Sequence, residues 1–405
     1  INNGIAPGGV ANSIREDPRK PGLLYAATET QVWASFDDGD TWHSLRLDMP
    51  AVSVQDIRVK DDSTCMCSDL VAGTHGRGFW ILDNLTPLRQ VAEAQEADVA
   101  YLFRPATALR VRFGTNDPTE WTPELPHGEN PLPGGIIDYY LPADASGPVT
   151  LEILDDDGIV VRSLSSEDPV LEPDPALDPE GYDKICQENP RAPNCRVPLY
   201  WPAPQMVLST RKGMHRFSWD LHFEPIGDEP RAGGGATGAV PGRTYPRVQA
   251  PWAPPGEYTV RLTVNGERFT QPLSLRLDPR VTTSEADLAL LASLSREMWD
   301  GAVAANAASE EARARVAEFE AAGNAEARAR VEALAPASSG GSSRFSSSSG
   351  QPTLQSVSRA MMSAAMAMQG AEVAPTERQV AACEAARAQF EGVMRLWLAL
   401  KGSIS

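Results

Sequence analysis

Short runs of apolar residues, several of them alternating with polar ones, fill the first 88 residues of the chain. Each run has the length of a β-strand, and Asp, Gly and Pro residues separate the runs, which is typical of strands joined by turns. The expected strands are residues 22–28, 31–36, 43–47, 54–59, 69–74 and 78–82. We therefore expect β-sheets in this part of the chain.

One pattern in this region occurs twice. The runs "YAAT" and "VWAS" are followed about 45 residues later by "VAGT" and "GFWIL", and a repeat of this length is typical of β-propeller blades. Propellers usually close with about four to eight blades. Residues 1–88 are therefore expected to be the last blades of an incomplete ring, with the remaining blades upstream or on another chain.

A short linker is expected at residues 89–97. Over residues 98–280 the expected strands are joined by tight hairpin turns. One hairpin is expected to turn at Asp157-Gly158, and another at Asn265-Gly266, a dipeptide preferred in two-residue hairpin loops. Short strands with such turns favour an antiparallel β-sandwich. Two stretches rich in Pro, Gly and acidic residues are expected to be long surface insertions, namely 166–205 and 227–255.

Apolar spacing changes to that of helices from residue 281 to residue 405. Ser284 and Thr376 stand where helices are expected to begin, and Gly323 stands where one is expected to end. The helical stretches are 284–299, 309–324, 354–368 and 376–400. We predict three or four helices of an antiparallel bundle, with a Ser- and Gly-rich connector at 336–352. The fold class is mainly β with an α-helical C-terminal region.

Charge and length narrow the function classes. The 405 residues suggest several domains, and 36 basic against 54 acidic residues give a net charge of −18. Such a balance repels phosphate backbones and anionic lipid surfaces, so nucleic acid is a poor partner. No apolar run approaches the roughly 20 residues of a membrane-spanning helix. The chain begins at Ile1 without a signal-peptide pattern, which suggests either processing or a piece of a longer polypeptide.

Five cysteines weakly favour an oxidising compartment. Cys186 and Cys195 flank a polar, proline-containing loop that a disulfide could close, and a metal pair is less favoured because no His lies nearby. Cys65 and Cys67 are close in sequence and could be free, paired together or paired elsewhere. Cys383 falls on an apolar helical seam and is expected to be buried.

The octapeptide "SFDDGDTW", residues 35–42, carries the most specific motif of the chain. Ser35, Asp37, Gly39, Thr41 and Trp42 match every position of S/T-x-D-x-G-x-T-W, which resembles the Asp-box, the bacterial-neuraminidase repeat of sialidases and sortilin-like receptors. The resemblance implies a hairpin turn between the third and fourth strands of a blade, closed by hydrogen bonds to the aspartate. We expect Gly39 to take a positive φ and Trp42 to cover the blade.

Two further stretches carry resemblances. "GTHGRGFWILDN", residues 73–84, resembles the closing-blade signature of Asp-box proteins and of inverting xyloglucanases. His75 and Arg77 there could face a ligand, with Arg77 as a carboxylate anchor, or Arg77 could brace a neighbouring blade. "GMHRFSWDLHFEP", residues 213–225, followed by "APPGEYTVRL", residues 253–262, resembles the paired strands of an immunoglobulin-like domain, in which Phe217 and Trp219 would be core.

Enzyme signatures are otherwise missing from the sequence. It contains no nucleophile elbow, no H-E-x-x-H motif and no phosphate-binding glycine loop. We assign no catalytic residue, no metal ligand and no cofactor. A calcium loop would need more regularly spaced oxygen ligands and a closing Glu than the aspartates near Asp37 provide.

The resemblance implies a secreted, periplasmic or cell-surface bacterial propeller protein. The first hypothesis is a non-catalytic C-terminal segment that binds a glycan or protein ligand or assembles with a partner. A second is the C-terminal portion of a secreted glycoside hydrolase, sialidase- or xyloglucanase-like, with its active site mostly upstream. A third is a structural component of a cell-surface assembly.

Overall fold

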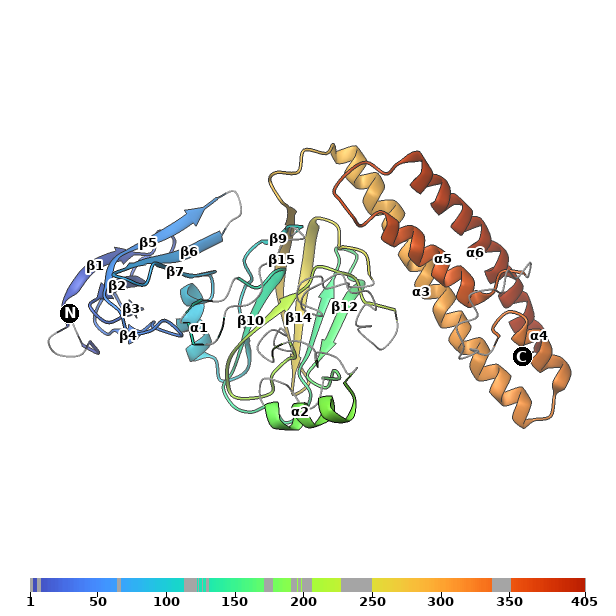
Figure 1. Cartoon of the computed structure of the whole chain (residues 1–405), viewed down its shortest axis with the longest axis horizontal. Helices are drawn as coiled ribbons and strands as arrows, with labels where there is room; N and C mark the ends of the chain where they lie inside the picture. The colour runs from blue at the N-terminus through green and yellow to red at the C-terminus, as the bar shows by residue number, and fades with distance from the viewer. Residues whose placement is uncertain are drawn as a thin grey trace. The chain divides into compact units, whose positions relative to one another are not determined.

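A computed structural model describes most of the chain. The described residues are 3–5, 9–63, 67–112, 131–170, 178–190, 206–226, 250–336 and 351–404, with 122, 124, 125, 127, 128, 195 and 198. Strands and helices are both present, one sheet curls into a half-barrel, and the C-terminal region is helical (Figure 1). The chain forms two compact units, of which the second contains the C-terminal helices.

Two small antiparallel sheets make up the first part of the chain. The first sheet has four strands in sequential order, which are β1 (Ala11–Glu16), β2 (Leu24–Thr28), β3 (Val32–Ser35) and β4 (His43–Ser44). The second has three, which are β5 (Val54–Asp62), β6 (Cys67–Thr74) and β7 (Phe79–Leu82). Strand β1 was not among the expected strands, because its sequence ANSIRE is mostly polar and exposed on both faces.

The two sheets share one hydrophobic core. Tyr25 from β2 and Val54 and Ile57 from β5 are fully buried in it, and Leu70 from β6 is 3% exposed. Burying a large apolar side chain contributes about 1.5–3 kcal/mol to folding, so this shared core stabilises both sheets together. The short helices η1 (Leu88–Gln90) and α1 (Val91–Glu96) follow and occupy most of the stretch expected to be a linker.

Two further sheets follow in the same unit. A three-stranded sheet has the order β13-β10-β8, with β8 (Tyr101–Leu102), β10 (Gly135–Leu141) and β13 (Gly213–Trp219). A five-stranded sheet has the order β12-β11-β14-β15-β9, with β9 (Ala108–Arg110), β11 (Thr150–Leu154), β12 (Val160–Ser165), β14 (Gly256–Val264) and β15 (Glu267–Leu277). Neighbouring strands are antiparallel except β15 and β9, which are parallel.

Turns and ring contacts organise these two sheets. Asn265 and Gly266 join β14 to β15 with φ values of 51° and 85°, as a tight hairpin turn requires. Trp219 of β13 packs edge-on against Tyr258 of β14, with ring centroids 5.3 Å apart. This contact joins one sheet to the other, and both side chains are buried. Helix α2 (Pro179–Glu188) lies within the first stretch expected to be an insertion.

The described part of the helical region, residues 280–336 and 351–404, contains four helices. These are α3 (Glu285–Ala321), α4 (Ala325–Glu332), α5 (Leu354–Ala367) and α6 (Glu377–Ile404). The two stretches expected from 284 to 324 are one continuous helix, α3. Gly301 lies within it at a close approach to α5, because a Cβ placed there would lie 2.1 Å from the terminal methyl group of Met361. Glycine therefore serves here for helix packing and does not break the helix.

Side chains cap these helices where the sequence indicates. The Ser284 hydroxyl accepts the backbone N–H of Asp287 at the start of α3, and the Thr376 hydroxyl accepts that of Gln379 at the start of α6. Gly323 follows α3 with a φ of 67°. Such caps satisfy backbone groups that have no partner within the helix.

Two short segments from the middle of the chain belong to the helical unit. His222 forms a bridge with Trp252, and Phe223 stacks on Trp299 of α3 with ring centroids 6.4 Å apart. Trp252 also donates its backbone N–H to the side chain of Gln369, after α5, at 3.0 Å. Residues 250–254, expected to end a surface insertion, thus pack in this unit, whereas residues 227–249 lie outside the described part, as do residues 337–350 of the expected connector.

Gly134 provides a test of the sheet packing. It has a φ of 107°, and a Cβ there would lie 2.1 Å from the backbone oxygen of Trp219. We predict that Gly134→Ala lowers the free energy of unfolding by about 2 kcal/mol or more, because backbone strain and the clash add. Thermal and urea unfolding followed by circular dichroism measures the loss. Gly147→Ala is the control, since Gly147 has open space around its Cβ position; an equal loss there would contradict the interpretation.

Candidate functional site

The turn of residues 35–42, named the Asp-box turn for its resemblance in sequence alone, joins β3 to β4 and is closed by its own side chains. Asp37 Oδ1 accepts the Thr41 backbone N–H and the Ser35 hydroxyl, both at 2.8 Å, and Oδ2 accepts the Thr41 hydroxyl at 2.5 Å. Ser35 Oγ in turn accepts the Gly39 N–H at 2.8 Å. Both carboxylate oxygens are therefore engaged within the turn.

Backbone geometry explains the small residue in this motif. Gly39 has a φ of 92° and is buried, and Asp38 before it also has a positive φ, 58°. Asp38 and Asp40 are exposed. Trp42 is buried against Trp33 on the face of the first sheet that points away from the shared core.

The hydrogen bonds of the turn also lower the pKa of the Asp37 carboxyl group. The Thr41 hydroxyl, the Thr41 N–H and the Ser35 hydroxyl together lower the pKa of Asp37 to about 2. A carboxylate with so low a pKa is a poor general base near neutral pH. The geometry therefore assigns Asp37 to holding the hairpin, rather than to proton transfer.

His75 and Arg77 lie in the turn between β6 and β7. Gly76 and Gly78 have φ values of 85° and 68°, and Thr74 closes the turn by donating its N–H and its hydroxyl to the Gly78 carbonyl, at 3.0 and 2.7 Å. Both the His75 and the Arg77 side chains are exposed. This turn and the Asp-box turn belong to different sheets.

The cysteines divide into paired and free residues. A disulfide joins Cys186 of α2 to Cys195, with a Cα–Cα distance of 5.3 Å. Cys67 is disulfide-bonded as well, whereas Cys65 lies outside the described residues. Cys383 is a free cysteine on α6, and burial raises the pKa of its thiol. Its position is that of a small apolar residue in the helical core.

Asp17, Tyr25 and Arg89 form a buried ionic network that the sequence analysis did not predict. The Asp17 carboxylate is fully buried and accepts the Arg89 Nε–H at 3.0 and 3.1 Å and the Tyr25 hydroxyl at 3.1 Å. It also accepts the backbone N–H groups of Arg19 and Lys20. Burial and the neighbouring Asp17 charge raise the pKa of Tyr25, so the phenol remains protonated. No local motif indicates this contact, because Arg89 lies 72 residues from Asp17.

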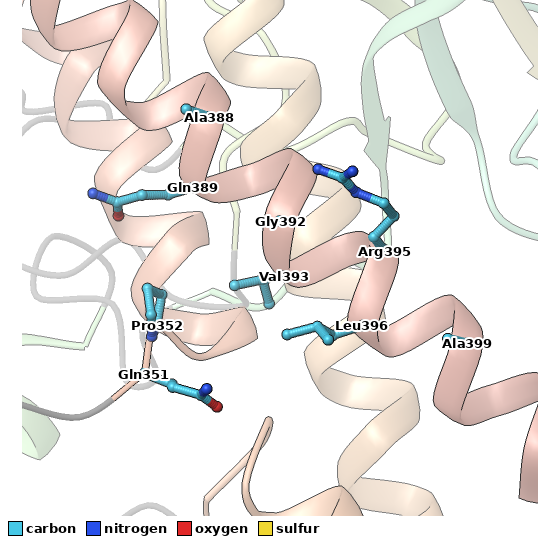
Figure 2. Close-up of a pocket in the computed structure, with 9 residues that line it drawn as sticks. All are labelled: Gln351, Pro352, Ala388, Gln389, Gly392, Val393, Arg395, Leu396 and Ala399. Carbon is cyan, nitrogen blue, oxygen red and sulfur yellow. The ribbon is translucent and has the colours of Figure 1, made fainter.

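An apolar hollow of about 670 Å³ lies on the helical unit. Figure 2 shows Val393 and Leu396 of α6 pointing toward Gln351 and Pro352, while Arg395 points away. None of the described residues that line it is acidic, a histidine or a cysteine. It therefore offers shape and apolar surface, without a group for acid–base or nucleophilic chemistry.

Comparison with known proteins gives no family assignment: neither a family model nor a curated protein matches the chain. Among the residues that the structure describes, no cluster of three or more His, Cys, Asp or Glu side chains could hold a metal ion. Within the same residues, no helix combines the length and the apolar character needed to cross a bilayer.

Protonation of Asp37 tests the assignment of the Asp-box turn. Because its pKa is lowered in the folded protein, the charged form stabilises the fold above the unfolded-state value, about 4, and this contribution is lost as the pH falls toward 2. We predict that Asp37→Asn lowers the melting temperature at pH 7 and that the gap to wild type narrows between pH 4 and about 2. Asp40→Asn, at an exposed neighbour, should show no such gap; a gap for Asp37→Asn that is constant with pH would contradict the assignment.

Substitution of Arg89 should lower the free energy of unfolding. Arg89→Met leaves the buried Asp17 carboxylate without its cation, and such a change typically costs about 3–5 kcal/mol. Arg19→Met is the control, since Arg19 pairs with Asp61 where both side chains are 29% exposed, and a pair of this kind contributes at most about 1 kcal/mol. Chemical unfolding of both variants measures the difference, and equal losses would show that burial of Asp17 does not govern stability.

Proposed function

We propose that the chain is the non-catalytic C-terminal segment of an extracellular Asp-box β-propeller protein and that it acts in partner binding and assembly. In this proposal β1–β7 are the last blades of an incomplete propeller. The following two sheets are an immunoglobulin-like β-sandwich, and the helices are an antiparallel bundle that braces the segment or docks a partner. The remaining blades would lie upstream or on another chain.

The exposed apolar face of the second sheet carries the proposal. Along β7, Trp80 and Leu82 pack toward the shared core, whereas Phe79 and Ile81 point outward and are 81% and 56% exposed. On the first sheet, Ile14 of β1 is 54% exposed and pairs with Ala26, on the face away from the shared core. These are the outer faces of two different sheets, and neighbouring exposed apolar residues such as Phe79 and Ile81 are typical of interaction sites.

The Asp-box geometry supports a mechanical role in place of a catalytic one. Both carboxylate oxygens of Asp37 accept hydrogen bonds from Ser35 or Thr41. Because these bonds lower its pKa, Asp37 is a poor general base. The disulfide between Cys186 and Cys195 supports an oxidising, extracytoplasmic compartment, where disulfides persist.

Substitution of the outer face tests whether it belongs to an interface. We predict that Phe79→Ser combined with Ile81→Thr changes the free energy of unfolding by no more than about 0.5 kcal/mol, because neither side chain is buried in the isolated chain. The variant should also bind less of the dye ANS, which reports exposed apolar surface. Ile57→Thr in the shared core is the control and should cost about 2 kcal/mol or more. If the double variant lost as much free energy of unfolding as Ile57→Thr, the proposal would be contradicted.

Glycan release tests the competing hydrolase function. Purified chain should release no sugar from sialylated or xyloglucan substrates above the level of the Asp37→Asn variant. Saturable turnover that a single carboxylate substitution in the first two sheets abolishes would end the non-catalytic proposal.

A further inference from the structure

The second sheet has one strand fewer than the first, and among the described strands its two edges are β5 and β7. In the first sheet the chain passes from β3 through the Asp-box turn to β4. After β7 it turns away instead: Asn84 has a φ of 60°, and Leu85 is fully buried and donates its N–H to the Ser68 carbonyl. Among the described strands, only β6 pairs with β7.

An exposed strand edge invites pairing with another strand, because its backbone groups stay available. The outward residues of β7 add apolar surface to that edge. Phe79 lies over Gly73 of β6, where a Cβ would be 3.6 Å from its ring, and Ile81 is opposite Val71. The edge therefore offers both hydrogen-bonding groups and a row of apolar side chains.

Charges of opposite sign stand at the two ends of β7. Arg77, before the strand, is exposed. Asp83, after the strand, is half-buried close to Asp69 and Arg216, and burial together with the Asp69 charge raises its pKa. An additional cation near Asp83 would therefore be favourable, because it would offset the repulsion between the two carboxylates.

We propose that two copies of this chain associate through antiparallel pairing of β7 with β7, an inference that rests on the proposed function and names its partner. A register centred on Trp80 places Phe79 opposite Ile81 of the second copy. It also brings Arg77, in the turn before the strand, to the end of the strand where Asp83 of the second copy lies. Two-fold symmetry then forms each pair twice.

Self-complementarity selects a second copy over an unrelated strand. When a second copy of β7 lies antiparallel to the first, the Arg77 cation comes near the Asp83 anion, and the Phe79 ring comes near the β-branched Ile81. Both are favourable cross-strand pairs. A two-fold dimer uses the same patch on both subunits, so such a patch must be complementary to itself. The Arg77 side chain thus acts as a carboxylate anchor, with Asp83 of the second copy as its carboxylate.

Sedimentation velocity of the 405-residue chain over a concentration series tests this dimer. The wild type should show a monomer–dimer equilibrium, and Arg77→Asp should weaken it about tenfold or more, because two ion pairs become repulsive contacts. Arg46→Asp makes the same change in charge at an exposed position after β4 and should leave the equilibrium unchanged.

Mixing two variants makes the test specific for the register. Asp83→Arg alone should also weaken dimerisation, and an equimolar mixture of Arg77→Asp and Asp83→Arg chains should form heterodimers, in which both pairs again have opposite charges. If Asp83→Arg fails to fold by circular dichroism, Phe79→Asp replaces it as the second weakening variant.

Three outcomes would overturn the dimer: a wild type that stays monomeric at all concentrations, dimers insensitive to Arg77→Asp, or no heterodimer between two folded variants. In each case the neutral stability of the Phe79 and Ile81 double variant would still support an interface with other propeller blades. A large loss of stability in that double variant would instead remove the proposed function itself.

Discussion

Burial of Tyr25, Val54 and Ile57 between the first two sheets is the interaction on which the first ninety residues depend. Neither sheet is large enough to bury its apolar side chains alone. The Asp-box turn and the Asp17–Arg89 pair add two further contacts to this arrangement. One fixes the hairpin between β3 and β4, and the other ties the chain after β7 back to the end of β1.

The shared core also explains why the side chains on the outer faces of the two sheets differ from those on the inner faces. Each strand alternates its side chains, so a sheet with one covered face presents its remaining residues outward. On β7 those residues are Phe79 and Ile81, which are apolar, where a solvent-facing strand would carry polar ones. The proposed interface rests on the composition of this face.

Local chemistry made much of the fold predictable. Strands β2 to β7 follow alternation and turn residues, and the caps at Ser284 and Thr376 mark helix starts. Strand β1, the continuity of α3 and one buried ion pair were not predictable in this way. The sequence suggests two helices, over residues 284–299 and 309–324, whereas α3 continues through Gly301, where α5 approaches closely. The pairing of Asp17 with Arg89 depends on tertiary structure alone.

The route of the chain through the helical unit has a genetic consequence. That unit combines residues around Phe223 and Trp252 with the helices from Glu285 onward, and strands of the other unit lie between these segments in the sequence. A single recombination point could not transfer it to another gene without β14 and β15 of the other unit. The two units should therefore be inherited together, and the aromatic anchors should be gained or lost only along with Trp299.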